Sequence, residues 1–166
     1  MAFGNHVLTM EPTFEKLLVL LAEGEVRFII VGGIAVTLQG YVRLTEDIDL
    51  LLDAEEENIT RLLGVLSSYG EGFARELTPS DFTNDEGAIR IVEEVEQCQI
   101  DLFTRIAGRT FREVLSDADI FRLRAYEIPY ASKASLIGWK RDSVREKDRL
   151  DALALANLGR RDTQEG

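Results

Sequence analysis

Two aspartates at alternate positions of an apolar run are the first feature of this sequence that could do chemistry. Asp47 and Asp49 lie in DIDLLLD, whose other residues favour a buried strand. Side chains at i and i+2 project from the same face of a strand, so the two carboxylates would lie side by side and repel each other. A divalent cation would compensate that repulsion.

A third aspartate, Asp101, lies in QIDLF, a strand-like segment of the same type. If this strand pairs beside DIDLLLD, three carboxylates converge and form a site suited to Mg²⁺ or Mn²⁺. Two such ions about 4 Å apart can stabilise the attacking and leaving oxygens of a phosphoryl displacement. The other interpretation is that each aspartate ends on solvent at a sheet edge.

Polar and small residues around the first two aspartates point to phosphate. Gly32 and Gly33 end the apolar run FIIV and open a short helical segment, so exposed backbone amides could bind a triphosphate there. Alone, the glycine pair could equally be a tight turn. Arg43 and Thr45 precede the aspartates on alternate positions and could contact phosphate, orient the carboxylates, or form a surface salt bridge.

The elements that would position these residues alternate between helix and strand. Apolar spacing predicts helices over 14–24, 33–39, 54–70, 132–141 and 143–159, and strands over 26–31, 47–53, 88–92 and 97–103. This order predicts an α/β (α+β) fold with a small mixed sheet flanked by helices. We expect a single domain over 1–166, with a loose arm (1–12), a sheet core (13–104) and a basic, mainly helical end (105–161).

Composition narrows the class of protein. The net charge is −11, with 6 Lys/Arg against 20 Asp/Glu in residues 1–104 and 13 against 8 in residues 105–161. An acidic first part could hold cations and a basic later part could face phosphates, whereas a nonspecific binder of long nucleic acid should be basic overall. No apolar run is long enough for a membrane span, and the single cysteine, Cys98, fits a reducing cytoplasm.

Several motifs together carry a family resemblance. VGG, thirteen residues (34–46), D-I-D with apolar flanks and a later I-D-L strand resemble the nucleotidyltransferase superfamily that includes DNA polymerase β. The C-terminal stretch IPYASKASLIGWKRDSVREKDRLDAL is similar to the end of the AbiEii-type toxin nucleotidyltransferases.

The resemblance implies transfer of a nucleoside monophosphate from an NTP with release of pyrophosphate, using two Mg²⁺ or Mn²⁺ ions. Asp47 and Asp49 would bind both ions. Asp101 would bind the catalytic ion and help to deprotonate the acceptor hydroxyl. Lys140 would neutralise phosphate charge from the helical side.

The same resemblance implies further partners. Arg145 and Lys147 could assist nucleotide binding, although on a helix with neighbouring acids they could equally form an ion-paired solvent face. The acceptor would be RNA, tRNA or a protein, and a toxin role would imply a cognate antitoxin.

Two other functions remain open. Lincosamide adenylyltransferases have a similar length, the same G-G and D-x-D layout and a segment like IPYASK, which favours an antibiotic as the acceptor. A non-catalytic nucleotide-binding or antitoxin-like module is the other alternative. The retained charge repulsion between the aspartates argues against it.

Overall fold

A mixed sheet forms the centre of the molecule. The computed structural model describes residues 12–41, 45, 47–141 and 152–157. Within them, six strands pair in the order β3-β4-β2-β1-β8-β7. In chain order these strands are β1 (Phe28–Val31), β2 (Asp47–Leu52), β3 (Ile89–Glu93), β4 (Cys98–Phe103), β7 (Asp119–Leu123) and β8 (Tyr126–Tyr130).

Parallel and antiparallel pairs alternate across this sheet. β1 runs antiparallel to β2 and parallel to β8. β2 runs parallel to β4, while the hairpins β3–β4 and β7–β8 are antiparallel. The predicted small mixed sheet flanked by helices is therefore confirmed.

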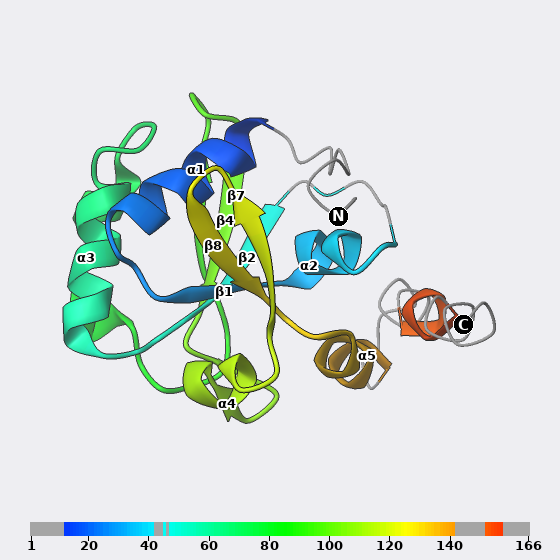
Figure 1. Ribbon diagram of the computed structural model, residues 1–166. Helices are drawn as coiled ribbons and strands as arrows, with labels where there is room; N and C mark the ends of the chain where they lie inside the picture. The colour runs from blue at the N-terminus through cyan, green and yellow to red at the C-terminus, as the bar shows by residue number, and fades with distance from the viewer. Residues whose placement is uncertain (1–11, 42–44, 46, 142–151, 158–166) are drawn as a thin grey trace.

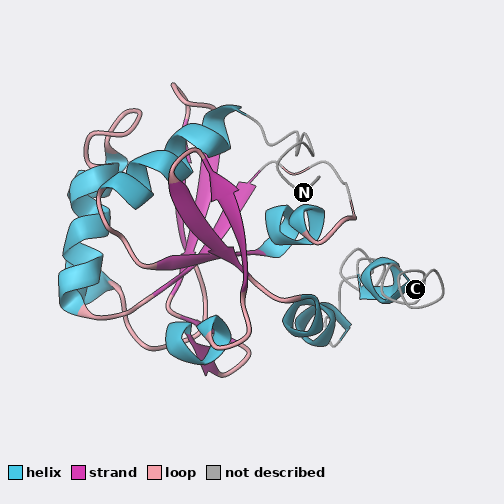
Figure 2. Ribbon diagram, viewed as in Figure 1, coloured by secondary structure: helices cyan, strands magenta, loops and turns pink. Residues whose placement is uncertain are grey.

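Helices lie on both sides of the strands (Figures 1 and 2). In the view of Figure 1, α3 lies to the left of the sheet, α1 crosses its upper left part, and α2 and α5 lie to the right. The helices are α1 (Pro12–Glu23), α2 (Gly32–Leu38), α3 (Glu56–Leu66), α4 (Phe111–Leu115) and α5 (Lys133–Arg141). The structure also has two 3-10 turns, η2 (Phe73–Glu76) and η3 (Pro79–Asp81), and a small pair of strands, β5 (Arg105–Ile106) and β6 (Arg109–Thr110).

The core explains why these segments fold as they do. β1 is buried along its whole length, and Ile48, Leu50 and Leu52 of β2 are fully buried. Burying apolar surface contributes about 25 cal/mol per Å² to folding, so these residues hold β2 in the middle of the sheet. Because the side chains of a strand alternate, that burial fixes which face the aspartates occupy.

Residues 105–130 contain the strands β5 to β8 and the short helix α4. The helix and β8 lie where the sequence predicts a short helix over 110–115 and extended backbone around Pro129. The side chains of DIFRL are exposed or half-buried throughout, as expected of an edge strand, and YEIPY pairs with it as a hairpin. The predicted arm lies outside the described residues except for Pro12. Of the predicted helix 143–159, residues 152–157 are described and helical.

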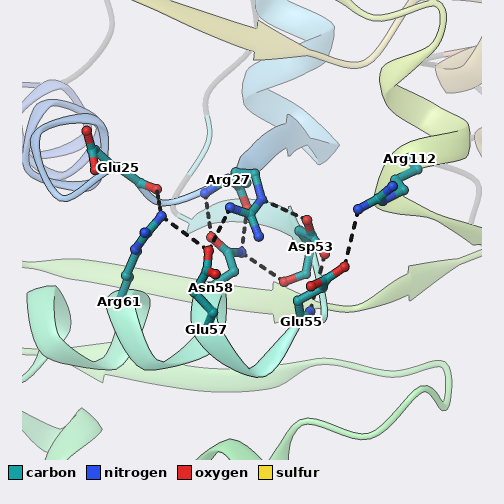
Figure 3. A network of polar contacts seen from close by, with 8 residues as sticks. All are labelled: Glu25, Arg27, Asp53, Glu55, Glu57, Asn58, Arg61 and Arg112. Atoms are coloured by element: carbon teal, nitrogen blue, oxygen red, sulfur yellow. Dashed lines mark hydrogen bonds and ion pairs between the residues drawn. The ribbon is translucent and has the colours of Figure 1, made fainter.

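A polar network braces the end of the sheet where β1 begins and β2 stops (Figure 3). Asn58 on α3 is fully buried, and its carboxamide accepts a hydrogen bond from the Arg27 backbone N–H at 2.7 Å. It donates to the carbonyl oxygens of Arg27 at 3.0 Å and Asp53 at 2.8 Å. Arg27 also donates to the Asp53 carboxylate at 2.8 Å. One side chain on α3 thus binds backbone groups of the residue before β1 and of the residue after β2.

Asn58→Ala is expected to lower the free energy of unfolding by about 3 kcal/mol, because it removes three hydrogen bonds of a fully buried side chain and leaves the Arg27 backbone N–H and the Asp53 carbonyl without that partner. Urea unfolding followed by circular dichroism measures this. The matched control is Glu57→Ala, which removes an exposed ion pair to Arg27 from the same network and should cost less than about 1 kcal/mol. Equal midpoints for the two variants would contradict a bracing role for Asn58.

Candidate active site

The three aspartates meet on neighbouring strands. Asp47 and Asp49 lie on β2, and Asp101 lies on β4 directly opposite Asp49 in the parallel register. Each aspartate offers one carboxylate oxygen such that all three oxygens lie within 4.8 Å of one another. The expected convergence is therefore present, because the β3–β4 hairpin pairs beside β2.

Crowding perturbs the acidity of two of these carboxyl groups. Burial, followed by repulsion from Asp47 and Asp101, raises the pKa of Asp49 to about 8. Burial, together with the neighbouring Asp101 carboxylate, also raises the pKa of Asp47. Oδ1 of Asp49 is buried and has no hydrogen-bond partner. A carboxylate that is buried without a hydrogen-bond partner is stabilised either by a nearby cation or by taking up a proton.

Arg90 also belongs to the site, although it is not part of any motif in the sequence. It lies on β3 opposite Asp101, and its guanidinium donates to both carboxylate oxygens, from Nε at 2.9 Å and from an Nη at 3.2 Å. Burial alone would raise the pKa of Asp101, but the hydrogen bonds from Arg90 lower it overall. Counting back from the turn of the β3–β4 hairpin would have placed Arg90 across from Asp101.

Gly32 has a second reason to be glycine. Its backbone has φ +71°, a conformation that side chains disfavour. A Cβ at this position would lie 2.0 Å from Oδ2 of Asp49, so the strand-to-helix turn passes directly over that carboxylate. The glycine therefore makes room for an acidic group, in addition to any contact with phosphate.

The remaining predicted residues are placed only in part. Gly33 lies in α2, and Thr45 is half-buried two residues before Asp47. Lys140 belongs to α5, but its side chain lies outside the description. Arg43, Arg145 and Lys147 also lie outside the described residues. Their roles, like those of the aspartates, stay predictions.

The donor set fits a hard divalent cation. Carboxylate oxygens are the ligands that Mg²⁺ and Mn²⁺ prefer, and three of them converge here. The unpartnered Oδ1 of Asp49 is consistent with a missing positive partner. Asp101 keeps ligand capacity as well, since each carboxylate oxygen can accept more than the one bond that Arg90 donates.

Comparison with solved structures places this geometry in a known fold. The structure of the lincosamide antibiotic adenylyltransferase LnuA, with lincomycin bound, superposes with a TM-score of 0.62 and 18% sequence identity, over 89% of this chain and 96% of that one. The chain has a nucleotidyltransferase-type fold. An antigenic nucleotidyltransferase-like protein from Paracoccidioides brasiliensis is similar at a TM-score of 0.51 and 18% identity, over 87% of this chain and 73% of that one.

Other comparisons add no narrower family. No protein-family model matches the chain, and no curated protein matches it in sequence. The AbiEii-type resemblance therefore stays a prediction. Among the helices that the structure describes, none has the length and apolar character needed to cross a membrane.

The raised pKa of Asp49 gives a pH-dependent expectation. Because the folded protein holds this proton up to about pH 8 while an aspartate in the unfolded chain loses it near its ordinary pKa of 3.8, the metal-free protein should lose stability as pH rises through that window. A cation must displace the proton, so millimolar Mn²⁺ should raise the melting temperature more at pH 8 than at pH 6.

Asp49→Asn is the control for this expectation. Without an ionisable group at position 49, the metal-free variant should melt with a weaker pH dependence, and Mn²⁺ should stabilise it less. Differential scanning fluorimetry at pH 6, 7 and 8 is sufficient. If Mn²⁺ changes the melting temperature of neither the wild type nor Asp49→Asn at any of these pH values, the three aspartates do not form a cation site.

Proposed function

We propose that this protein is a divalent-cation-dependent nucleotidyltransferase, which transfers a nucleoside monophosphate from an NTP to an acceptor hydroxyl. The observation that carries the proposal is the convergence of Asp47, Asp49 and Asp101 within 4.8 Å on a nucleotidyltransferase-type fold. Fold alone does not define activity, because function resides in the site. Structural similarity to nucleotidyltransferases would not be enough for this proposal without the three carboxylates.

The chemistry is a displacement at the α-phosphorus. The acceptor oxygen forms a bond to that phosphorus, the bond to the β-phosphate oxygen breaks, and pyrophosphate leaves with the electron pair. Bound Mg²⁺ or Mn²⁺ would supply charge stabilisation for the attacking and leaving oxygens. Asp47 and Asp49 hold the cations, while Asp101 binds at the acceptor side and helps to remove the hydroxyl proton.

Other residues serve the triphosphate in this proposal. The backbone amides at Gly32 and Gly33 face the phosphates, and Lys140 neutralises their charge from α5. A set of polar residues close to these in sequence would assist nucleotide binding: Arg43, Thr45, Arg145 and Lys147. The resemblance to nucleotidyltransferases supports the roles of Lys140, Arg145 and Lys147, and residue type and position in the motif support the others.

Two classes of acceptor have specific support. RNA, tRNA or a protein is favoured by the similarity of the C-terminal sequence to AbiEii-type toxins, and that function would bring a cognate antitoxin as a partner. A small antibiotic is favoured by the likeness to LnuA, whose chain is covered almost end to end. A non-catalytic nucleotide-binding module would leave the crowded carboxylates without a use.

An acceptor screen tests the proposal. The protein is incubated with Mg²⁺ and each NTP labelled in the α-phosphate, in separate reactions with total RNA, a protein extract and lincomycin. Label in one acceptor class that depends on both Mg²⁺ and Asp47 identifies the substrate. Nucleotide binding without label in any reaction would favour the non-catalytic module.

A further inference from the structure

The ion pair between Arg90 and Asp101 joins an exposed side chain to a buried one. The Arg90 side chain is 61% exposed on the edge strand β3, whereas the Asp101 side chain is 6% exposed. The guanidinium reaches inward from the edge of the sheet and bonds both oxygens of the buried carboxylate. Such a two-point contact is among the strong, geometrically specific ion pairs.

This contact places a permanent positive charge inside the carboxylate cluster. An arginine keeps its charge at every pH at which the protein is folded. Each carboxylate oxygen of Asp101 already accepts one bond from Arg90, so a cation that uses the remaining lone pairs must bind beside the guanidinium. Asp49 contrasts with Asp101, because its Oδ1 is buried without a partner.

We propose that Arg90 is a built-in counter-ion that competes with the second divalent cation for the Asp101 carboxylate. The first cation binds through Asp47 and Asp49. The second binds weakly beside the guanidinium and tightly when Arg90 swings away, which its exposed position on an edge strand permits. A bound triphosphate offers the guanidinium another anionic partner, so nucleotide binding would complete the site. This inference rests on the proposed function, since it assumes that the aspartates bind cations.

Mn²⁺ binding to the purified protein, measured by the electron paramagnetic resonance signal of free Mn²⁺, tests the inference without any activity assay. Wild type is expected to bind one ion more tightly than a second. Arg90→Gln should tighten the second ion at least about 10-fold, the size by which one neighbouring charge shifts the ionisation of a carboxylate. Thermal melting of the same samples shows that the variant is folded.

Two further variants separate charge from packing. Arg90→Lys keeps the positive charge and should bind the second ion as weakly as wild type does. Arg122→Gln removes an exposed arginine from the matching cross-strand pair with Glu127 on β7 and β8, and should leave Mn²⁺ binding unchanged.

The possible outcomes are distinct. If wild type binds Mn²⁺ but Arg90→Gln binds the second ion no more tightly than wild type does, Arg90 does not compete with that ion. This result leaves the proposed function intact. Equal tightening in Arg90→Lys and Arg90→Gln also overturns the inference, because charge would then not be the cause. Absence of Mn²⁺ binding in both wild type and Arg90→Gln overturns the inference and the proposed function together.

Discussion

Asp101→Asn is expected to slow nucleotidyl transfer at least about 100-fold while NTP binding in the presence of Mg²⁺ stays close to that of wild type. The triphosphate is held through Gly32, Gly33 and the cation on Asp47 and Asp49, so losing the third carboxylate costs little ground-state affinity. Its role in placing the second cation and receiving the acceptor's proton matters mainly in the transition state. Asp47→Asn, by contrast, should lose both binding and transfer.

Initial rates with the acceptor from the screen, together with NTP affinity by isothermal calorimetry, measure the two quantities separately. Asparagine is nearly isosteric, and Arg90 can still donate to its carbonyl oxygen, so the fold should survive. Glu127→Gln is the control, since it removes a carboxylate from the cross-strand pair with Arg122. Transfer at the wild-type rate by Asp101→Asn would mean that this aspartate is only a strand residue.

Gly32→Ala is expected to be the most destabilising small substitution in the site. The new Cβ would lie 2.0 Å from Oδ2 of Asp49, and the backbone φ of +71° disfavours any side chain. Strain at such a position costs about 1–3 kcal/mol before the collision is counted. We expect a loss of about 3 kcal/mol or more in unfolding free energy, and a loss of Mn²⁺ stabilisation because the Asp49 carboxylate must move.

A double-mutant cycle separates the two causes. In an Asp49→Ala background the contacts with the carboxylate are gone and only the contact with the Cβ of residue 49, at 3.0 Å, remains, so Gly32→Ala should cost little more than the backbone strain. Gly64→Ala on the exposed face of α3 is the matched control. A Cβ there meets nothing within 4 Å, so it should stabilise the helix by about 0.5–1 kcal/mol. If Gly32→Ala unfolds like wild type, the turn does not pack on Asp49.

Some of the site could be predicted because strand periodicity is strict. Asp47 and Asp49 share a face of β2 because side chains alternate, and the segment around Asp101 has the same pattern. Sequence motifs place such residues on one face, but they do not give the partner strand. The parallel register that brings Asp49 opposite Asp101 became known only with the structure.

Other features depend on contacts that no motif encodes. Arg90 reaches the site from a neighbouring strand, so only the register of the hairpin reveals it. The close approach of Gly32 to Asp49 depends on the path of a turn. In the stretch 105–130, β5 and β6 have two residues each, too few for a periodic pattern to reveal them.

The position of the transferred label tests the central claim most directly. The protein, Mg²⁺ and the identified acceptor are incubated in parallel with an NTP labelled in the α-phosphate and with the same NTP labelled in the γ-phosphate. Nucleotidyl transfer predicts label in the acceptor from the α-labelled NTP only, label in pyrophosphate from the γ-labelled one, and neither product with Asp49→Asn. Transfer of the γ-label, or α-label transfer that survives Asp49→Asn, would contradict the account.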